Sequence, residues 1–316
     1  MDPPINLCFL GHITRDLIRH ELLQPFAQPG GNAWYGAQAA TRLGANVRVI
    51  TRMAPDDVPS LTRELVALGV EVEVLSSSAT TTFVNEYWSG NPDGRRQRLL
   101  STATAFESSD VPGDAAVYVF GPLTLVDMEV ECLAAAPKDA LTALDIQGLI
   151  RSSDIGPVTH VRNPALADYV RLSTIVKASR EEALSASRAT SVLEALDWFR
   201  NKGAREVLLT MGRDGSLVAT RDGVYDIPAY RVSDEIDTTG CGDTYLAAYV
   251  LKRVEGLCPE EAGHFASAVA GFVACAHGVP SITAGKATKL VSGARATDIR
   301  PRLRRSHPGS NPEHSS

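Results

Sequence analysis

Residues 237–249 read Asp-Thr-Thr-Gly-Cys-Gly-Asp-Thr-Tyr-Leu-Ala-Ala-Tyr, a polar turn that runs directly into small and apolar residues. Gly240 and Gly242 flank Cys241, and two glycines around one residue let three successive amides point into one concavity. A helix that starts here adds the positive end of its dipole. The stretch therefore predicts an anion-binding turn at the N-terminus of a helix.

Asp243 lies in the first turn of that predicted helix, beside whatever anion the turn holds. A carboxylate repels a phosphate, but it suits a base that takes a proton from an attacking hydroxyl. We interpret the stretch as a site of phosphoryl transfer to an alcohol, with Asp243 as the base. The predicted anion hole consists of the amides of Gly240, Cys241 and Gly242. The plainer alternative is that Asp237 or Asp243 only caps the helix and the glycines only form a turn.

Residues 237–243 resemble the D-T-x-G-A-G-D motif of the ribokinase (PfkB) family of small-molecule kinases, with Cys241 in place of the usual alanine. Residues 30–45 read Gly-Gly-Asn-Ala-Trp-Tyr-Gly-Ala-Gln-Ala-Ala-Thr-Arg-Leu-Gly-Ala and are similar to the glycine pair of that family and the helix after it. The resemblance implies an α/β fold, the ribokinase-like three-layer sandwich: a mostly parallel sheet with helices on both faces, plus a small β-sheet lid. It also implies the activity of an ATP-dependent kinase.

Short apolar runs alternate with segments of helical periodicity along most of the chain. The predicted strands cover residues 5–10, 47–52, 116–120, 140–145, 160–162, 174–177, 206–210 and 216–220. The predicted helices cover residues 32–42, 60–68, 181–185, 191–201, 243–254 and 259–276. This alternation predicts a mainly parallel sheet with helices on both faces, as the resemblance does.

Residues 70–104 break the alternation, because they are β-rich, with polar and apolar residues in turn around a predicted turn at 91–94. The region resembles the small β-sheet lid of the family, which closes over the substrate. We expect lid strands from about residues 12–29 and 70–104, inserted in a kinase domain of residues 1–296. An ordinary edge hairpin is the alternative. The tail, residues 297–316, is too polar to fold and is predicted to be disordered.

The composition bounds the class of protein. The 316 residues are 44% hydrophobic and 22% charged, which is typical of a globular protein with a large core. No run approaches the ~18 apolar residues of a membrane span, so no membrane is expected as a partner. The net charge of −6 disfavours nucleic acid. The five cysteines lack C-x-x-C spacing and lie mostly in apolar segments, which indicates a reducing, cytoplasmic compartment and no metal cluster.

The resemblance also implies where MgATP binds. Residues 210–215 are similar to the T-x-G-x-x-G turn that lies by the phosphates and ribose of ATP. Residues 177–183 are similar to an N-x-x-E element that acts on Mg²⁺ through water; Glu182 matches its glutamate, and Ser179 replaces the asparagine. Residues 266–278 match the part that encloses adenine, and a tightly packed core helix is the equal alternative. The predicted ATP-binding residues are Lys177, Thr210, Gly212, Gly215, Asp237 and Thr238.

For the acceptor, Asp16 matches the aspartate with which the family binds two hydroxyls, and a carboxylate that accepts two O–H bonds suits a diol. Tyr35 stands where sugar kinases carry asparagine, which disfavours ribose. Residues 144–151 and 177–183 resemble segments of the myo-inositol kinases, so the leading acceptor is myo-inositol or a related cyclitol. A strand end with a surface arginine is the alternative for 144–151. The predicted acceptor-binding residues are Asp16, Gly30, Gly31, Asn32, Tyr35, Gln147 and Arg151.

Three classes of function stay open: an ATP-dependent kinase of a cyclitol, sugar or nucleoside, a non-catalytic relative that binds such a ligand, and a nucleotide-cofactor enzyme of Rossmann type. Asp243 counts against the second class, because a pure binder needs no base. Residues 11–16 lack the G-x-G-x-x-G that the third class requires. The sequence also leaves open whether a monovalent cation activates the enzyme and whether two chains form a homodimer through their lids.

Overall fold

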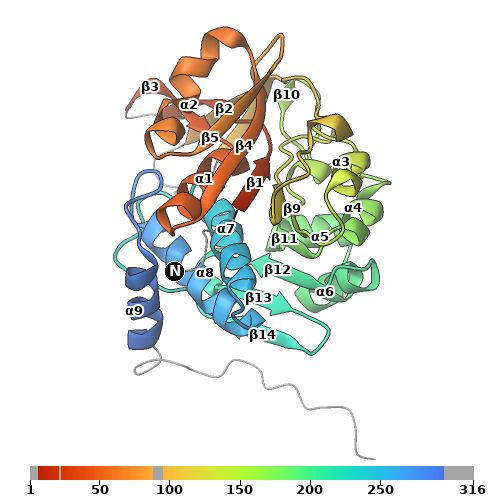
Figure 1. Cartoon of the computed structure of the whole chain (residues 1–316), viewed down its shortest axis with the longest axis vertical. Coiled ribbons are helices and arrows are strands. Elements are labelled where there is room, and N and C mark those ends of the chain that lie inside the picture. The colour runs from red at the N-terminus through yellow and green to blue at the C-terminus, as the bar shows by residue number, and fades with distance from the viewer. Residues whose placement is uncertain (1–5, 21–22, 88–94, 295–316) are drawn as a thin grey trace, which may run out of the picture.

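The computed structural model describes residues 6–20, 23–87 and 95–294, in which strands form a nine-stranded and a five-stranded sheet (Figure 1). From β12 to β5 the neighbouring strands of the large sheet are parallel, and β13 and β14 are antiparallel. In spatial order its strands are β14 (Val224–Ile227), β13 (Ser216–Ala219), β12 (Glu206–Thr210), β11 (Ile175–Ser179), β9 (Leu141–Asp145), β8 (Val117–Phe120), β1 (Asn6–Leu10), β4 (Asn46–Met53) and β5 (Glu71–Ser76).

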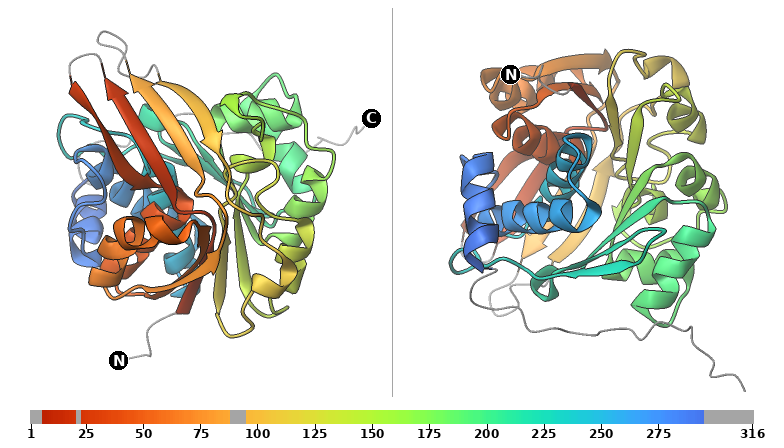
Figure 2. Two further views of the ribbon diagram at one scale, coloured as in Figure 1. Left: turned by 90° about the horizontal axis from the view of Figure 1, so that it is seen from above. Right: turned by 60° about the horizontal axis from the view of Figure 1, so that its bottom comes forward.

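Helices cover both faces of the large sheet, which gives three layers (Figure 2). The strands are apolar on both faces: Leu7 and Phe9 of β1 pack in one core, and Cys8 and Leu10 pack in the other. Helices of the first core are α1 (Asn32–Arg42), α2 (Val58–Ala67), α7 (Cys241–Val254), α8 (Pro259–Ala274) and α9 (Ala284–Ala294). Helices of the second core are α3 (Val130–Ala135), α4 (Leu166–Leu172), α5 (Arg180–Ser187) and α6 (Val192–Asn201).

The small sheet lies at the carboxyl edge of the large one. β2 (Thr14–His20) follows β1 after three residues, and β3 (Leu23–Gly30) leads into α1. Its strands, in spatial order, are β10 (Gly156–Pro157), β7 (Arg95–Ser101), β6 (Thr82–Tyr87), β2 (Thr14–His20) and β3 (Leu23–Gly30). The predicted fold class is thus confirmed, both in the parallel sheet between two helical layers and in the second, smaller sheet.

Two sequence predictions were wrong. Residues 71–76, which were expected in the lid, form β5 at the edge of the large sheet, parallel to β4. Their polar alternation reflects an edge strand with one exposed face. Residues 160–162 do not form a strand; only His160 makes a bridge, to Arg151, before Pro164 follows. The predicted turn at 91–94 and the predicted tail lie outside the described residues.

No helix in the described ranges is both long enough and apolar enough to cross a membrane.

Candidate active site

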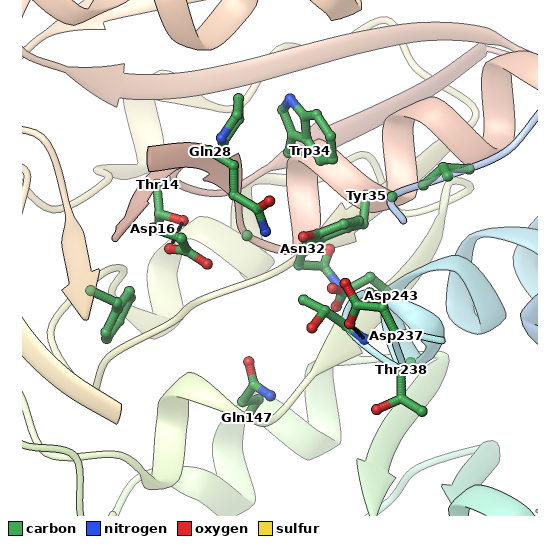
Figure 3. A pocket seen from close by; sticks show the side chains of 18 of the residues that line it. Thr14, Asp16, Gln28, Asn32, Trp34, Tyr35, Gln147, Asp237, Thr238 and Asp243 are labelled. Carbon is green, nitrogen blue, oxygen red and sulfur yellow. Dashed lines mark hydrogen bonds between the residues drawn. The ribbon is translucent and has the colours of Figure 1, made fainter. Parts of the chain in front are cut away.

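A cleft of about 1130 Å³ lies between the small sheet and the carboxyl ends of the large sheet (Figure 3). Figure 3 shows Asp16 and Asp243 on opposite sides of this hollow, with Asn32 and Tyr35 of α1 between them. Four predicted site residues do not line it: Gly30, Cys241, Gly212 and Gly215. Those that do are Asp16, Gly31, Asn32, Tyr35, Gln147, Arg151, Lys177, Glu182, Thr210, Asp237, Thr238, Gly240, Gly242 and Asp243.

Asp243 lies in the first turn of α7, as the sequence predicted. The side-chain amide of Asn32 donates a hydrogen bond of 2.9 Å to Asp243 Oδ1, which fixes the carboxylate at the cleft. The amide of Gly242 lies in the same first turn, where a helix supplies no acceptor of its own. The amide of Cys241 differs from the prediction, because it donates to the carbonyl of Thr238 at 3.2 Å. Gly240 and Gly242 therefore remain the better candidates for holding an anion.

Gly240 is tightly enclosed by Tyr35. Its φ of +79° lies in the left-handed region, and a Cβ atom there would lie 2.3 Å from the Tyr35 ring. Burial raises the pKa of Tyr35, and the carboxylates of Asp16, Asp237 and Asp243 add to the shift. The phenol therefore stays neutral and keeps a proton to donate.

Lys177 is the centre of a buried ion cluster beside the anion turn. Its ammonium lies 2.9 Å from Asp145 Oδ2 and 3.9 Å from Glu182 Oε2. A Cβ on Gly242 would lie 3.0 Å from Lys177 Nζ, so the cation adjoins the turn. The position follows from the topology, because β9 and β11 are neighbours and their carboxyl ends meet at one edge.

In this cluster, burial and the neighbouring positive charges shift the pKa values of the carboxyl groups in opposite directions. Burial raises the pKa of Asp243, and the charge of Lys177 and the amide of Asn32 counter that shift without cancelling it. For Glu182, burial acts upward, but Lys177, Arg151 and the amide of Ser179 outweigh it and lower the pKa. Asp243 is thus a carboxyl group with increased basicity beside a carboxylate that stays ionised.

The chemistry of Glu182 fits Mg²⁺ held mainly by phosphates and water. Its Oε2 accepts from the Ser179 amide at 2.8 Å, and its Oε1 accepts from Gln147 Nε2 at 3.2 Å. Within the described part of the chain, no cluster of three or more His, Cys, Asp or Glu could ligate a metal alone. Mg²⁺ typically keeps several waters and binds substrate phosphates, so a carboxylate that orients a ligand water is consistent with it.

A chain of hydrogen bonds starts at Asp16 and crosses the small sheet. Thr14 Oγ1 donates to Asp16 Oδ1 at 2.7 Å, and Asn85 Nδ2 donates to Asp16 Oδ2 at 3.2 Å. Gln97 Nε2 donates to Asn85 Oδ1 at 2.9 Å, and Arg151 donates to Gln97 Oε1 at 3.2 Å. Asp16 is buried, with 7% of the residue exposed, and its carboxylate is held in place from both sides.

Gly30 acts on the site from behind Asp16. A Cβ on Gly30 would lie 2.5 Å from Asp16 Oδ2, so a larger residue would displace the carboxylate. At Gly31 the φ is +95°, and a Cβ there would lie 2.4 Å from the carbonyl oxygen of His12. The glycine pair thus leaves room for the Asp16 carboxylate and the His12 carbonyl, and of the two glycines only Gly31 lines the cleft.

The predicted donor turn follows β12, which ends at Thr210. The 3-10 turn η4 (Gly212–Asp214) leads to Gly215, whose φ is +88° and whose Cβ would lie 2.1 Å from the carbonyl oxygen of Ile227. Gly212 and Gly215 therefore shape the turn and do not line the cleft. The predicted donor residues that do line it at this end are Thr210, Asp237 and Thr238.

Sequence reasoning missed several polar residues of the cleft and its support. Asp145, Asn85, Thr14 and Gln97 bond to predicted site residues or to one another. Phe83, Asn85 and Tyr87 share one face of β6, and Phe83 and Tyr87 line the cleft. Asp145 lies within residues 144–151, and the resemblance of that stretch to the myo-inositol kinases implies no role for it.

Three features together define a small-molecule phosphotransferase: the α/β fold, the glycine turn at the N-terminus of α7 and the buried carboxyl group of Asp243. The profile of the pfkB family carbohydrate kinases matches residues 5–284. The chain belongs to that family, and it is therefore a phosphotransferase that acts on an alcohol group of a small molecule.

Known proteins resemble the chain at modest identity. It is 30% identical to a ribokinase of Staphylococcus aureus over 173 residues, which are 48% of this chain and 56% of that relative. It is 25% identical to an aminoimidazole riboside kinase of Salmonella typhimurium over 288 residues, which are 87% and 88% of the two chains. A solved pyrophosphate-dependent kinase of the ribokinase family, in complex with a pyrophosphate analogue and myo-inositol, superimposes with a TM-score of 0.77 at 25% identity. That match covers 87% of this chain and 97% of the other.

Proposed function

We propose that this kinase transfers the terminal phosphoryl group of a magnesium-bound phosphoanhydride, ATP by the family resemblance, to a hydroxyl of a small polyol. Myo-inositol or a related cyclitol is the leading acceptor. The observation that carries the proposal is that Asp16 and Asp243 line one cleft, with the second at the amide-rich turn of α7. The solved relative with bound myo-inositol supports a cyclitol.

The proposed chemistry is a single displacement. Asp243 takes the proton of the acceptor hydroxyl, whose oxygen forms a bond to the terminal phosphorus while the bridging O–P bond breaks and its oxygen leaves with the remaining phosphate. The amides of Gly240 and Gly242 stabilise charge on the transferred group. Glu182 would hold Mg²⁺ through water, and the bound ion would offset negative charge on the phosphates. Asp16 aligns two acceptor hydroxyls.

A panel of acceptors tests this proposal. Inositols, ribose, fructose phosphates and nucleosides are incubated with the protein, Mg²⁺ and either ATP or pyrophosphate, and mass spectrometry detects the phosphorylated acceptor. We expect a phosphorylated cyclitol at the highest kcat/KM. A nucleoside or phosphosugar as the best acceptor would refute the cyclitol assignment and leave the kinase assignment in place.

Asp16→Asn is expected to raise the KM for the acceptor about 10-fold to 100-fold, since hydrogen bonds to a charged group contribute about 1.5–3 kcal/mol. The kcat should change much less, because Asp16 does not touch the transferred phosphoryl group in this proposal. Asp56→Asn, the same change at an exposed position, is the matched control. An unchanged acceptor KM would remove Asp16 from the acceptor site.

Gly240→Ala is expected to lower kcat/KM about 100-fold, because the added Cβ displaces either the turn or Tyr35, and a shift of ~1 Å in an active site has such effects. Gly44→Ala is a matched control, since Gly44 also has a positive φ, +102°, but has no atom within 4 Å of an added Cβ. The control should lose about 1–2 kcal/mol of stability and no activity. Equal kcat/KM losses in both variants would refute the steric argument.

A further inference from the structure

The donor end of the cleft combines polar with apolar residues, and part of it is widely exposed. Arg213 is 60% exposed, and its Nε donates to Glu235 Oε2 at 2.6 Å, which joins the η4 turn to the segment before α7. Ile236 is 57% exposed. The lining residues at this end are Arg213, Glu235, Ile236, His277, Gly278 and Val279. A planar base binds best in an enclosed and mostly apolar slot. Half of these residues are polar and both Arg213 and Ile236 are largely exposed, so this surface suits a planar base poorly.

By the family resemblance, a slot for adenine would lie against the small residues of α8. Residues 228–237 cover that face of the helix. Gly263, Ser267 and Gly271 are four residues apart on α8, which packs against β14, and Cys275 caps the end of the helix. A Cβ on Gly263 would lie 3.0 Å from Ile227 Cγ1.

Residues 228–237 follow that face closely. Ser267 Oγ donates to the carbonyl of Pro228 at 2.6 Å, and Cys275 Sγ donates to that of Ser233 at 3.5 Å. The amides of Ile236 and Asp237 both donate to the carbonyl of Ala274, at 2.7 and 3.2 Å. The segment is therefore bonded to α8 at both ends and in between.

The closest approach is at Gly271, where an added Cβ would lie 2.0 Å from the carbonyl oxygen of Tyr230. Tyr230 is buried, and its hydroxyl lies 2.7 Å from His264 Nδ1. Backbone thus packs directly on backbone, and neither residues 228–234 nor α8 line the cleft. Of residues 266–278, the part up to Ala274 is a tightly packed core helix, one of the two interpretations that the sequence allowed, whereas His277 and Gly278 line the cleft.

We infer that the donor is an inorganic phosphoanhydride without a nucleoside, with pyrophosphate as the simplest form. This inference rests on the proposed function, and it replaces ATP as the expected donor. The acceptor oxygen would bond to one phosphorus of pyrophosphate, the bridging O–P bond would break, the alcohol proton would pass to Asp243, and orthophosphate would leave. The donor would then present only phosphate groups, which suit the turn of Gly240 and Gly242 at the N-terminus of α7.

The test compares three donors with the full-length protein, Mg²⁺ and the best acceptor: pyrophosphate, inorganic triphosphate and ATP. Initial rates of acceptor phosphorylation are measured by mass spectrometry. Triphosphate and ATP carry the same phosphates, so their comparison isolates the nucleoside. We expect the kcat/KM of pyrophosphate to exceed that of ATP at least about tenfold, and triphosphate to bind no more weakly than ATP. Adenosine should not inhibit the pyrophosphate reaction.

The outcomes separate the two proposals. If ATP matches or exceeds pyrophosphate in kcat/KM, or if adenosine competes with the donor, the inference is overturned while the proposed function stands. If no donor phosphorylates any acceptor of the panel, both are overturned.

Discussion

Lys177→Met is expected to lower the free energy of unfolding by about 3–5 kcal/mol, because it leaves two buried carboxylates without their cation. Asp145 is 2% exposed and Glu182 is 5% exposed. Asp145 loses its ion-pair partner at 2.9 Å, while Glu182 keeps its hydrogen bonds from the Ser179 amide and from Gln147. Urea unfolding of both proteins measures the difference.

Two comparisons sharpen this test. Lys289→Met, at an exposed position of α9, should change the free energy of unfolding by less than about 0.5 kcal/mol. The double variant with Lys177→Met and Asp145→Asn should regain part of the loss, since it removes one unpaired charge. A single variant within about 1 kcal/mol of the parent protein would show that the cluster does not stabilise the fold.

The sequence predicted the large sheet well, because runs such as residues 206–210 are mostly apolar, as expected for strands that are buried on both faces. It was less successful where a strand lies at an edge. Residues 71–76 alternate like a lid strand, and only the pairing with β4 assigns them to the large sheet. The short helices α3 and α4 were not predicted, since six or seven residues hold too few turns to show a period.

The active site was predictable where one motif carries it and unpredictable where distant residues meet. Gly240 to Asp243 are adjacent in sequence, so local geometry places Asp243. The pair of Lys177 and Asp145 depends on β9 and β11 being neighbours, which no local pattern states. The Cys241 amide was assigned to the anion, but the turn is tight enough for the Thr238 carbonyl to accept it.

Asp243→Asn is expected to lower kcat by about 10³-fold or more, with the KM values of acceptor and donor changed only a few-fold. The amide keeps the size of the carboxyl group but cannot take a proton, and general bases typically contribute 10²–10⁴ in rate. Asp234→Asn, at an exposed carboxyl group of the segment before α7, is the matched control and should leave kcat unchanged.

The parent enzyme should show the same group in its pH profile. Asp243 acts in its ionised form, so kcat/KM falls as the pH drops through its pKa. Because burial raises that pKa, against the opposing charge of Lys177, the fall should begin at a higher pH than for an ordinary aspartate. This acidic limb should be absent from the residual activity of Asp243→Asn.

The turnover of Asp243→Asn, measured with the best donor and acceptor at saturation, tests the assignment of the base most directly. The predicted result is a loss of about 10³-fold with both substrates still bound, as calorimetry can verify. A variant that retains kcat within about tenfold, a barrier change of only ~1.4 kcal/mol, would contradict it.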